Sequence, residues 1–444
     1  MFETSLDFVP YNVEYLRSKG LIVTENTDLG ISVVRYHKND NMWKTKTHGI
    51  CDLNDRDVYK HRSVIYSLTT GFPISVSPIS KIPDSNIGNT YLKKNVDNLV
   101  VTPYIDGTMI NVFWNPNINV ETGTPFGWTL STRSKIHATC KFTSDRLFKD
   151  LFEEARINCG MEYDNLDPLY NYTFVLVHPE TRRITSYDEP KIILVSMVRC
   201  IPNLDLSGNT KSICHILPFD EVQANADKIG TGIRLPELDI KAYNVLEKSM
   251  SLTEKDELNG WVISAREGSF NRIRILTDGF CECMYLRGDS ASYSTNYIRL
   301  LLMDKSDDII RKYLKWYPDE KDSIDNVKDV LKVIQTELYN LYVNRHIKRT
   351  MEHTNLPHWS RRPIFDLHGY YLRNRTPLTL SNVFEYFCYM SPSAVNRIIK
   401  NREKEIRNYQ AKADAAAAPA ALAAAAPLPA SEASTGPETK DIEC

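Results

Sequence analysis

The sequence predicts an α+β fold in which a mixed β body is followed by an α-helical C-terminal domain and a disordered tail. Up to residue 295, short runs rich in Val, Ile, Thr and aromatic residues alternate with Asn, Asp, Gly and Pro, as in strands joined by turns. Over 296–410, apolar residues recur at spacings of three and four, the period of an amphipathic helix. From residue 411, alanine dominates and prolines interrupt it. We therefore expect domains at 1–295, 296–410 and 411–444.

The expected strands of the body are short and are separated by turn-forming residues. They are Ile31–Tyr36, Ser63–Tyr66, Leu99–Thr102, Met109–Trp114, Tyr172–Val177, Lys191–Val198 and Gly260–Ile263. A helix is expected over Ser144–Ala155. Cys281 and Cys283 are also expected on a strand, where alternation would place both side chains on one face. Buried free thiols are the favoured interpretation of that pair.

The C-terminal domain contains one long amphipathic pattern. Its apolar members are Val327, Val330, Leu331, Ile334, Leu338 and Leu341. Ser323 is a plausible N-cap for this helix, and further helices are expected over 307–317 and 396–409. In the tail, Pro419, Pro427 and Pro429 break the helix that alanine alone would favour.

The composition excludes several classes of protein. The chain has 444 residues with 54 Lys and Arg against 56 Asp and Glu, so bulk charge does not attract nucleic acid. No apolar run reaches the roughly 20 residues that span a bilayer, and the first residues do not resemble a signal peptide. Nine scattered cysteines indicate reduced thiols. We expect a cytoplasmic or other intracellular protein, with location in a virus particle as a second option.

Three segments in a fixed order carry a resemblance to a known family. They are Tyr104-Ile105-Asp106-Gly107, then Val175-Leu176-Val177-His178-Pro179-Glu180-Thr181-Arg182, then Asn259-Gly260-Trp261-Val262-Ile263, which Met284-Tyr285-Leu286-Arg287 follows. Together they resemble the bacteriophage-type ATP-dependent RNA ligases, which are covalent nucleotidyltransferases. That family carries K-x-D-G, a glutamate in an apolar strand before P-E-x-R, then E-G-x-V-I and a K-x-K pair. The resemblance implies a nucleotidyltransferase fold for the body.

The departures from the family pattern fall on the positions that carry chemistry. In that family a lysine amine attacks the α-phosphate of ATP, carboxylates hold the metal, and cations stabilise the charge that develops on phosphate. The corresponding positions here are Tyr104, Val175, Asn259, Tyr285 and Arg287. We therefore expect no catalytic residues and no cofactor. ATP and Mg would be required only if the chain were active.

Other residues remain candidates for binding. The nucleotide-binding candidates, by resemblance, are Arg62, Lys81, Asp106, Gly107, Arg133, Asn259 and Arg287. The RNA-binding candidates are basic residues interleaved with Trp359, Tyr370 and Tyr371: Arg345, Lys348, Arg349, Arg361, Arg362, Arg373 and Arg375. A solvated basic face is the competing interpretation. The irregular spacing of His346, His353, His358 and His368 does not predict a metal site.

The leading hypothesis is a catalytically degenerate, RNA-ligase-like protein, leaning away from enzyme activity. It would be retained for RNA or nucleotide binding, or as a structural component such as a minor protein of a large DNA virus particle. Its expected partners are RNA, or proteins of an assembly through the Ala/Pro-rich tail, and not a membrane. The alternative is an active ATP-dependent RNA ligase with a displaced nucleophile, for which Lys81, Lys93 and Lys94 are the upstream lysines.

Overall fold

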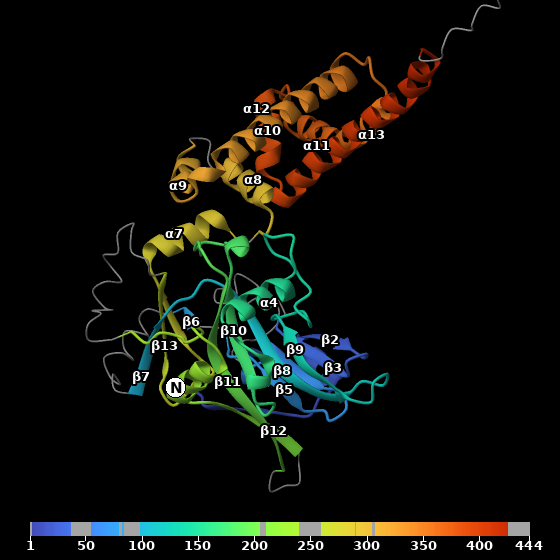
Figure 1. Ribbon diagram of the computed structural model, residues 1–444. Coiled ribbons are helices and arrows are strands. Elements are labelled where there is room, and N and C mark those ends of the chain that lie inside the picture. Colours follow the sequence, from blue (N-terminus) through green and yellow to red (C-terminus); the bar gives the residue numbers. More distant parts are fainter. Residues whose placement is uncertain are drawn as a thin grey trace, which may run out of the picture. The chain divides into compact units, whose positions relative to one another are not determined.

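The chain divides into two compact units, Met1–Ala291 and Ser292–Cys444 (Figure 1). The computed structural model describes residues 2–36, 55–79, 82–83, 98–204, 210–238, 259–288, 290–303 and 307–424. The first unit contains three sheets and the described part of the second is helical, which confirms the predicted α+β class. Lys81, Lys93 and Lys94 lie outside the described residues.

The largest sheet of the first unit has six strands, all paired antiparallel. In spatial order they are β1 (Ser5–Phe8), β12 (Thr210–Ile216), β11 (Lys191–Leu204), β10 (Asn171–Val177), β8 (Thr108–Ile118) and β9 (Pro125–Ser131). Helices α4 (Phe148–Asn158) and α5 (Phe219–Ile229) contribute to a hydrophobic core on this sheet. Phe152 of α4 packs edge-on against Phe174 of β10, with ring centroids 5.8 Å apart. The helix expected over 144–155 begins four residues later, at Phe148.

Two four-stranded sheets complete the first unit. One has the order β6 (Ile82–Pro83), β14 (Ile273–Leu276), β13 (Gly260–Ala265) and β7 (Leu99–Pro103). The other has the order β2 (Ile22–Asn26), β3 (Ile31–Arg35), β4 (Val64–Ser67) and β5 (Pro73–Val76). The short helix α1 (Val13–Ser18) precedes β2 in the sequence, and the short helix α2 (Arg56–Tyr59) lies between β3 and β4. A second core of β1, β3, β4 and β12 side chains includes Phe8, Tyr66 and Cys214.

The segment with the two closely spaced cysteines is a helix and not the predicted strand. Helix α7 (Asp278–Arg287) begins after Thr277, whose side chain accepts a hydrogen bond from the backbone N–H of Phe280 at 3.2 Å. A threonine N-cap and an acidic first turn favour a helix here. Cys281 is exposed and Cys283 is buried, so the two side chains do not share one environment.

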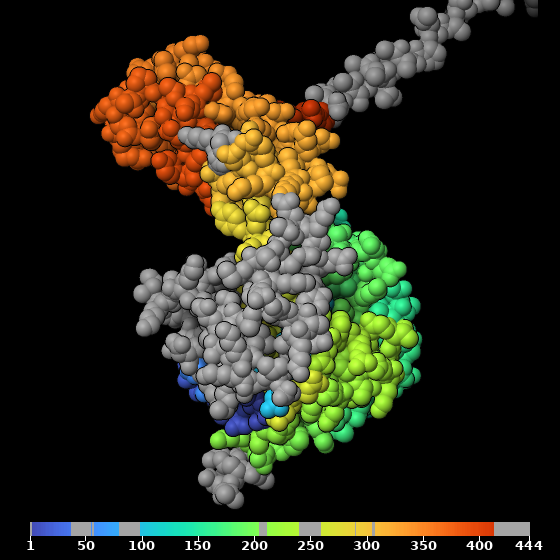
Figure 2. Space-filling model, turned by 90° about the vertical axis from the view of Figure 1, so that its left-hand side faces the viewer, coloured from blue at the N-terminus to red at the C-terminus, as the bar shows by residue number. Residues whose placement is uncertain are grey.

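The second unit is a bundle of helices, drawn in orange and red in Figure 2. They are α8 (Tyr293–Met303), α9 (Asp308–Trp316), α10 (Lys321–Tyr342), α11 (His358–Asn374), α12 (Leu380–Cys388) and α13 (Pro392–Ala424). The long amphipathic pattern is confirmed as α10, which buries Ile324, Leu331, Ile334 and Leu338. Ser323 lies inside this helix and does not cap it, because α10 begins at Lys321.

Helix α13 continues to Ala424, beyond residue 411, where we expected the tail to begin. Alanine is the strongest helix former, so the alanine-rich sequence favours continuation of the helix, although a proline such as Pro419 costs roughly 3 kcal/mol in a helix interior. Residues 425–444 lie outside the described residues. In the described ranges, every helix is too short or too polar to cross a bilayer.

Candidate functional site

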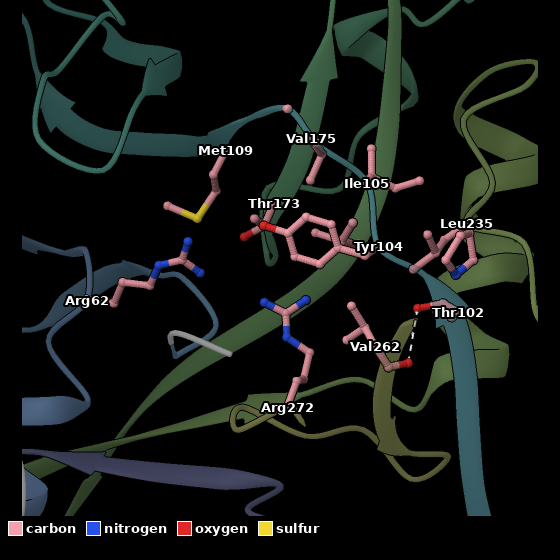
Figure 3. Close-up of a pocket in the computed structure, with 13 residues that line it drawn as sticks. Arg62, Thr102, Tyr104, Ile105, Met109, Thr173, Val175, Leu235, Val262 and Arg272 are labelled. Carbon is pink, nitrogen blue, oxygen red and sulfur yellow. Dashed lines mark hydrogen bonds between the residues drawn. The ribbon is translucent and has the colours of Figure 1, made fainter. Parts of the chain in front are cut away.

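A cavity of about 130 Å³ in the first unit joins segments that are distant in the sequence (Figure 3). Its described lining residues are Arg62, Thr102, Pro103, Tyr104, Ile105, Gly107, Met109, Thr173, Val175, Val195, Leu235, Val262 and Arg272. Tyr104 follows β7, Val175 lies on β10 and Val262 lies on β13. All three segments that carry the family resemblance therefore contribute to one cavity.

Tyr104, which the sequence resemblance aligns with a nucleophile, is held by the strands beside it. Its backbone N–H donates to the carbonyl of Gly260 at 2.8 Å, and Asn259 Nδ2 donates to its carbonyl at 3.3 Å. The ring packs edge-on against Phe280, with centroids 5.5 Å apart. Figure 3 shows the ring extending among the other lining side chains. The backbone thus presents residue 104 to the cavity, but the side chain presented is a phenol.

Two arginines share this cavity with Tyr104. In Figure 3 the guanidinium groups of Arg62 and Arg272 both point toward the tyrosine ring. Arg62 Nη1 donates to the Pro78 carbonyl at 3.1 Å, whereas Arg272 Nε is a buried donor without a hydrogen-bond partner in the described part of the chain. Burial, and then the nearby charge of Arg62, lower the pKa of Arg272 to about 9. Burial also lowers the pKa of Arg62.

The balance of charge in this cavity is positive. Among its described lining residues, there is no aspartate, glutamate or lysine. Two desolvated guanidinium groups with no carboxylate among the described lining residues are poised to bind an anion, because an anion would accept their hydrogen bonds and relieve their mutual repulsion. A phosphate group matches the planar fork of donors that an arginine presents.

Sequence reasoning missed Arg272 because the resemblance placed the cation pair on Tyr285 and Arg287. Tyr285 and Arg287 lie on α7, where Tyr285 is 58% exposed and Arg287 is 1% exposed. Arg287 Nη1 donates to the Ser290 carbonyl at 3.3 Å, and Arg287 does not line the cavity. Neither Tyr285 nor Arg287 is among the described residues that line the cavity.

Arg272 and Arg274 are two residues apart, like the lysines of a K-x-K pair, and they lie at the start of β14, the antiparallel neighbour of β13. Arg274 lies opposite Val262 in the register. The signal that could have located this strand is the alternation of Arg272, Ile273, Arg274 and Ile275, in which both isoleucines are buried.

Asp106 and Asn259 form an internal link and do not face the cavity. Asp106 Oδ2 accepts hydrogen bonds from the backbone N–H groups of Ile184 and Thr185, both at 3.1 Å. Thr185 Oγ1 in turn donates to Asn259 Oδ1 at 2.9 Å. Asn259 also holds the Tyr104 carbonyl. Asp106 and Asn259, two of the nucleotide-binding candidates, therefore connect the segment after β7, the start of β13 and the loop before β11.

Arg133 and Gly107 have structural partners as well. Arg133 donates to the Tyr36 carbonyl at 2.7 Å and to the Arg62 carbonyl at 3.3 Å, and burial lowers its pKa to about 10. It thereby fixes the backbone of Arg62 from outside the cavity. A side chain at Gly107 would meet the Leu176 carbonyl at 2.5 Å, so glycine permits the close approach to β10. Of the nucleotide-binding candidates that the structure describes, Arg62 and Gly107 line the cavity.

The RNA-binding candidates of the second unit differ in their surroundings. Arg361 donates to the Leu356 and Thr354 carbonyls at 3.1 Å each, and Arg362 pairs with Asp366 at 3.0 Å. Trp359 is buried. The remaining members are Arg345, which donates to the Met351 carbonyl at 3.3 Å, and the exposed Lys348, Arg349, Arg373 and Arg375. Arg361 and Arg373 lie roughly 18 Å apart along α11.

Of the four histidines between 346 and 368, two are in direct ring contact. The rings of His346 and His368 stack at a centroid distance of 3.8 Å and an interplanar angle of 11°. Parallel rings do not aim their nitrogen lone pairs at one shared ion. Within the described ranges, no group of three or more His, Cys, Asp or Glu side chains is placed to hold a metal.

The structure was compared with known proteins. No protein-family model and no curated protein matches the chain. Among solved structures, a provisionally assigned ATP-dependent DNA ligase from Aquifex aeolicus is similar at 15% identity and a TM-score of 0.38, covering 71% of this chain and 74% of the ligase. An archaeal ATP-dependent RNA ligase is similar at 12% identity and a TM-score of 0.38, covering 71% and 73%.

An RNA ligase mutant from Naegleria gruberi, solved with ATP and Mn, has 13% identity and a TM-score of 0.32, covering 62% of this chain and 84% of that one. The structural neighbours are thus ATP-dependent DNA and RNA ligases. Their identities and TM-scores are too low to assign an activity or a substrate to this chain.

Proposed function

We propose that the first unit is a ligase-like body that has lost covalent nucleotide transfer and keeps a phosphate-binding cavity. The observation that carries the proposal is the convergence of Arg62 and Arg272 on Tyr104. Covalent nucleotide transfer of the ligase type needs a lysine amine to form the phosphoamide. It also needs carboxylates for the metal. The described lining residues supply neither, since Tyr104 and Val175 stand at two of those positions.

The size of the cavity narrows the class of ligand. Pockets for complete small-molecule ligands are typically about 300–1,000 Å³, whereas this cavity is about 130 Å³. The Tyr104 ring extends into the space that the remaining side chains enclose. The cavity therefore accommodates the phosphate end of a ligand, such as the 5′-phosphate of an RNA, with the rest of the ligand outside it.

Direct binding tests this proposal. A fluorescent RNA oligonucleotide is titrated with the full chain, once with a 5′-phosphate and once with a 5′-hydroxyl. We expect tighter binding of the phosphorylated form. We also expect Arg272→Ala to weaken that form by roughly 10- to 100-fold, the equivalent of about 1.5–3 kcal/mol for a charge-assisted hydrogen bond. Arg62→Ala has the same expected direction.

The matched control is Arg234→Ala, which removes one arginine from the exposed Arg234–Asp227 pair of the same unit. It changes the net charge by the same amount and does not touch the cavity. Equal affinity for the two oligonucleotides, or equal losses in Arg272→Ala and Arg234→Ala, would overturn the proposal. Melting temperatures of all variants verify that each one folds.

A further inference from the structure

Cys200 and Cys214 face each other across two neighbouring strands of the large sheet. They are direct partners in the antiparallel register of β11 and β12. Their Sγ atoms lie 2.8 Å apart, longer than the roughly 2.05 Å of a disulfide bond. Opposite residues of an antiparallel pair have Cα atoms about 4.5–5.5 Å apart. That range falls within the roughly 4.4–6.8 Å that a disulfide spans, so the strand register is compatible with a bond between them.

The two thiols differ in their access to solvent. Cys214 is fully buried in the core that contains Phe8 and Tyr66, and Cys200 is half-buried at the edge of that core. Burial, and then the hydrogen bond to Cys200, raise the pKa of Cys214. The described residues provide no third ligand that would make a metal site of the pair. An oxidant therefore reaches Cys200 first, and Cys214 is positioned to resolve the product.

We propose that Cys200 and Cys214 form a reversible thiol–disulfide site whose oxidant is a small disulfide such as glutathione disulfide. The Cys200 thiolate attacks one sulfur of glutathione disulfide, which forms a mixed disulfide and releases one glutathione thiolate. Cys214 attacks the Cys200 sulfur, which forms the cross-strand bond, and its proton passes to the departing sulfur of the second glutathione. Two protein thiols are oxidised and one glutathione disulfide is reduced to two thiols.

The new bond would lock the register of the β11–β12 hairpin. Strand β12 also pairs with β1, and β11 pairs with β10, so the hairpin lies within the sheet and not at its edge. Cross-linking two strands removes conformations from the unfolded chain and stabilises the folded unit. The oxidised form is therefore the more heat-stable form of the first unit.

The sequence makes the test direct, because trypsin cleaves after Arg199 and Lys211 and separates the two cysteines. The reduced full-length protein is incubated with glutathione disulfide, its free thiols are alkylated, and the tryptic digest is analysed by mass spectrometry without reduction. We expect the peptides that contain Cys200 and Cys214 to appear as one cross-linked pair, which dithiothreitol separates. We also expect the oxidised protein to melt several degrees higher.

Three variants make the result specific. Cys214→Ser is expected to accumulate one glutathione on Cys200, whereas Cys200→Ser is expected to lose both the cross-link and the rise in melting temperature. Cys281→Ser removes an exposed thiol of the same unit and is expected to keep the full yield. The proposal is overturned if Cys281 becomes glutathionylated in the wild-type protein while Cys200 and Cys214 remain unlinked.

Discussion

Arg62 and Arg272 extend from different parts of the first unit to one tyrosine ring, and the charge of Arg62 adds to burial in lowering the pKa of Arg272 to about 9. None of the described lining residues is a carboxylate that would offset this repulsion. The two arginines supply the positive side of an ion pair, and a phosphate would supply the negative side.

This arrangement predicts that phosphate binding weakens at alkaline pH. The cation is the form that binds phosphate, so affinity is expected to be constant near neutral pH and to fall as the pH rises through about 9. Titrations of the 5′-phosphorylated oligonucleotide between about pH 7 and about pH 10 measure this. The same titration on Arg272→Ala is expected to lack the step. A step of equal size in that variant would assign the titration to another group.

Asp106 is predicted to stabilise the fold and not to bind the ligand. Asp106→Ala leaves the backbone N–H groups of Ile184 and Thr185 without their acceptor, which costs about 1–3 kcal/mol for a buried donor. Asp106→Asn keeps an acceptor oxygen and is expected to cost less. Urea denaturation measures the free energy of unfolding of both. A large loss of phosphate affinity in Asp106→Asn, with stability unchanged, would contradict this role.

Gly107 is predicted to be intolerant of a side chain. In Gly107→Ala the new Cβ would lie 2.5 Å from the Leu176 carbonyl and 2.6 Å from Val175 Cγ1. Strands β8 and β10 must then separate, at a cost of roughly 1–3 kcal/mol. Gly369→Ala in helix α11 is the control. The new Cβ would lie 3.7 Å from the flexible Arg373 side chain, and we expect a gain in stability of about 0.5–1 kcal/mol. Thermal melts of both variants measure the two changes, and we expect the melting temperature to fall in Gly107→Ala and to rise in Gly369→Ala.

The stacked histidines predict an acid-sensitive contact in the second unit, between the helical turn Val343–Ile347, which follows α10, and helix α11. Burial, followed by the charges of His368 and Arg345, lowers the pKa of His346 to about 4. The unfolded chain, with an ordinary value near 6.5, takes up a proton first. This contribution to stability is therefore present above about pH 6.5 and is lost as the pH falls toward 4.

His346→Phe keeps an aromatic ring beside His368 and cannot be protonated. Its melting temperature is expected to depend less on pH between about 4 and about 6.5 than that of the wild type. Tyr342 and Tyr371 complete the ring cluster and stay unchanged in this variant. Identical pH profiles would assign the acid sensitivity to other groups, of which the buried His61, with a pKa lowered to about 4, is the foremost.

The sequence was sufficient for several strands of the first unit, but not for all of them and not for the site. Alternation and apolar runs report which residues face a core, so β7, β10 and β13 were recognisable. The roles of Asp106 and Asn259 were not, because their partners at 184 and 185 lie far away in the sequence. Arg272 was missed because a strand as short as β14 has a weak periodic signal. The Cys281-x-Cys283 spacing indicated a strand, whereas the N-cap at Thr277 begins helix α7 at this place.

The central claim is that the cavity binds phosphate without forming a covalent bond to a nucleotide. Intact mass spectrometry after incubation with ATP and magnesium or manganese tests it most directly, with an active RNA ligase as a positive control. We expect the control to gain the mass of one adenylate and this protein to remain unchanged. An adenylate on a lysine of this chain, Lys81, Lys93 and Lys94 included, would contradict the account and establish a displaced nucleophile.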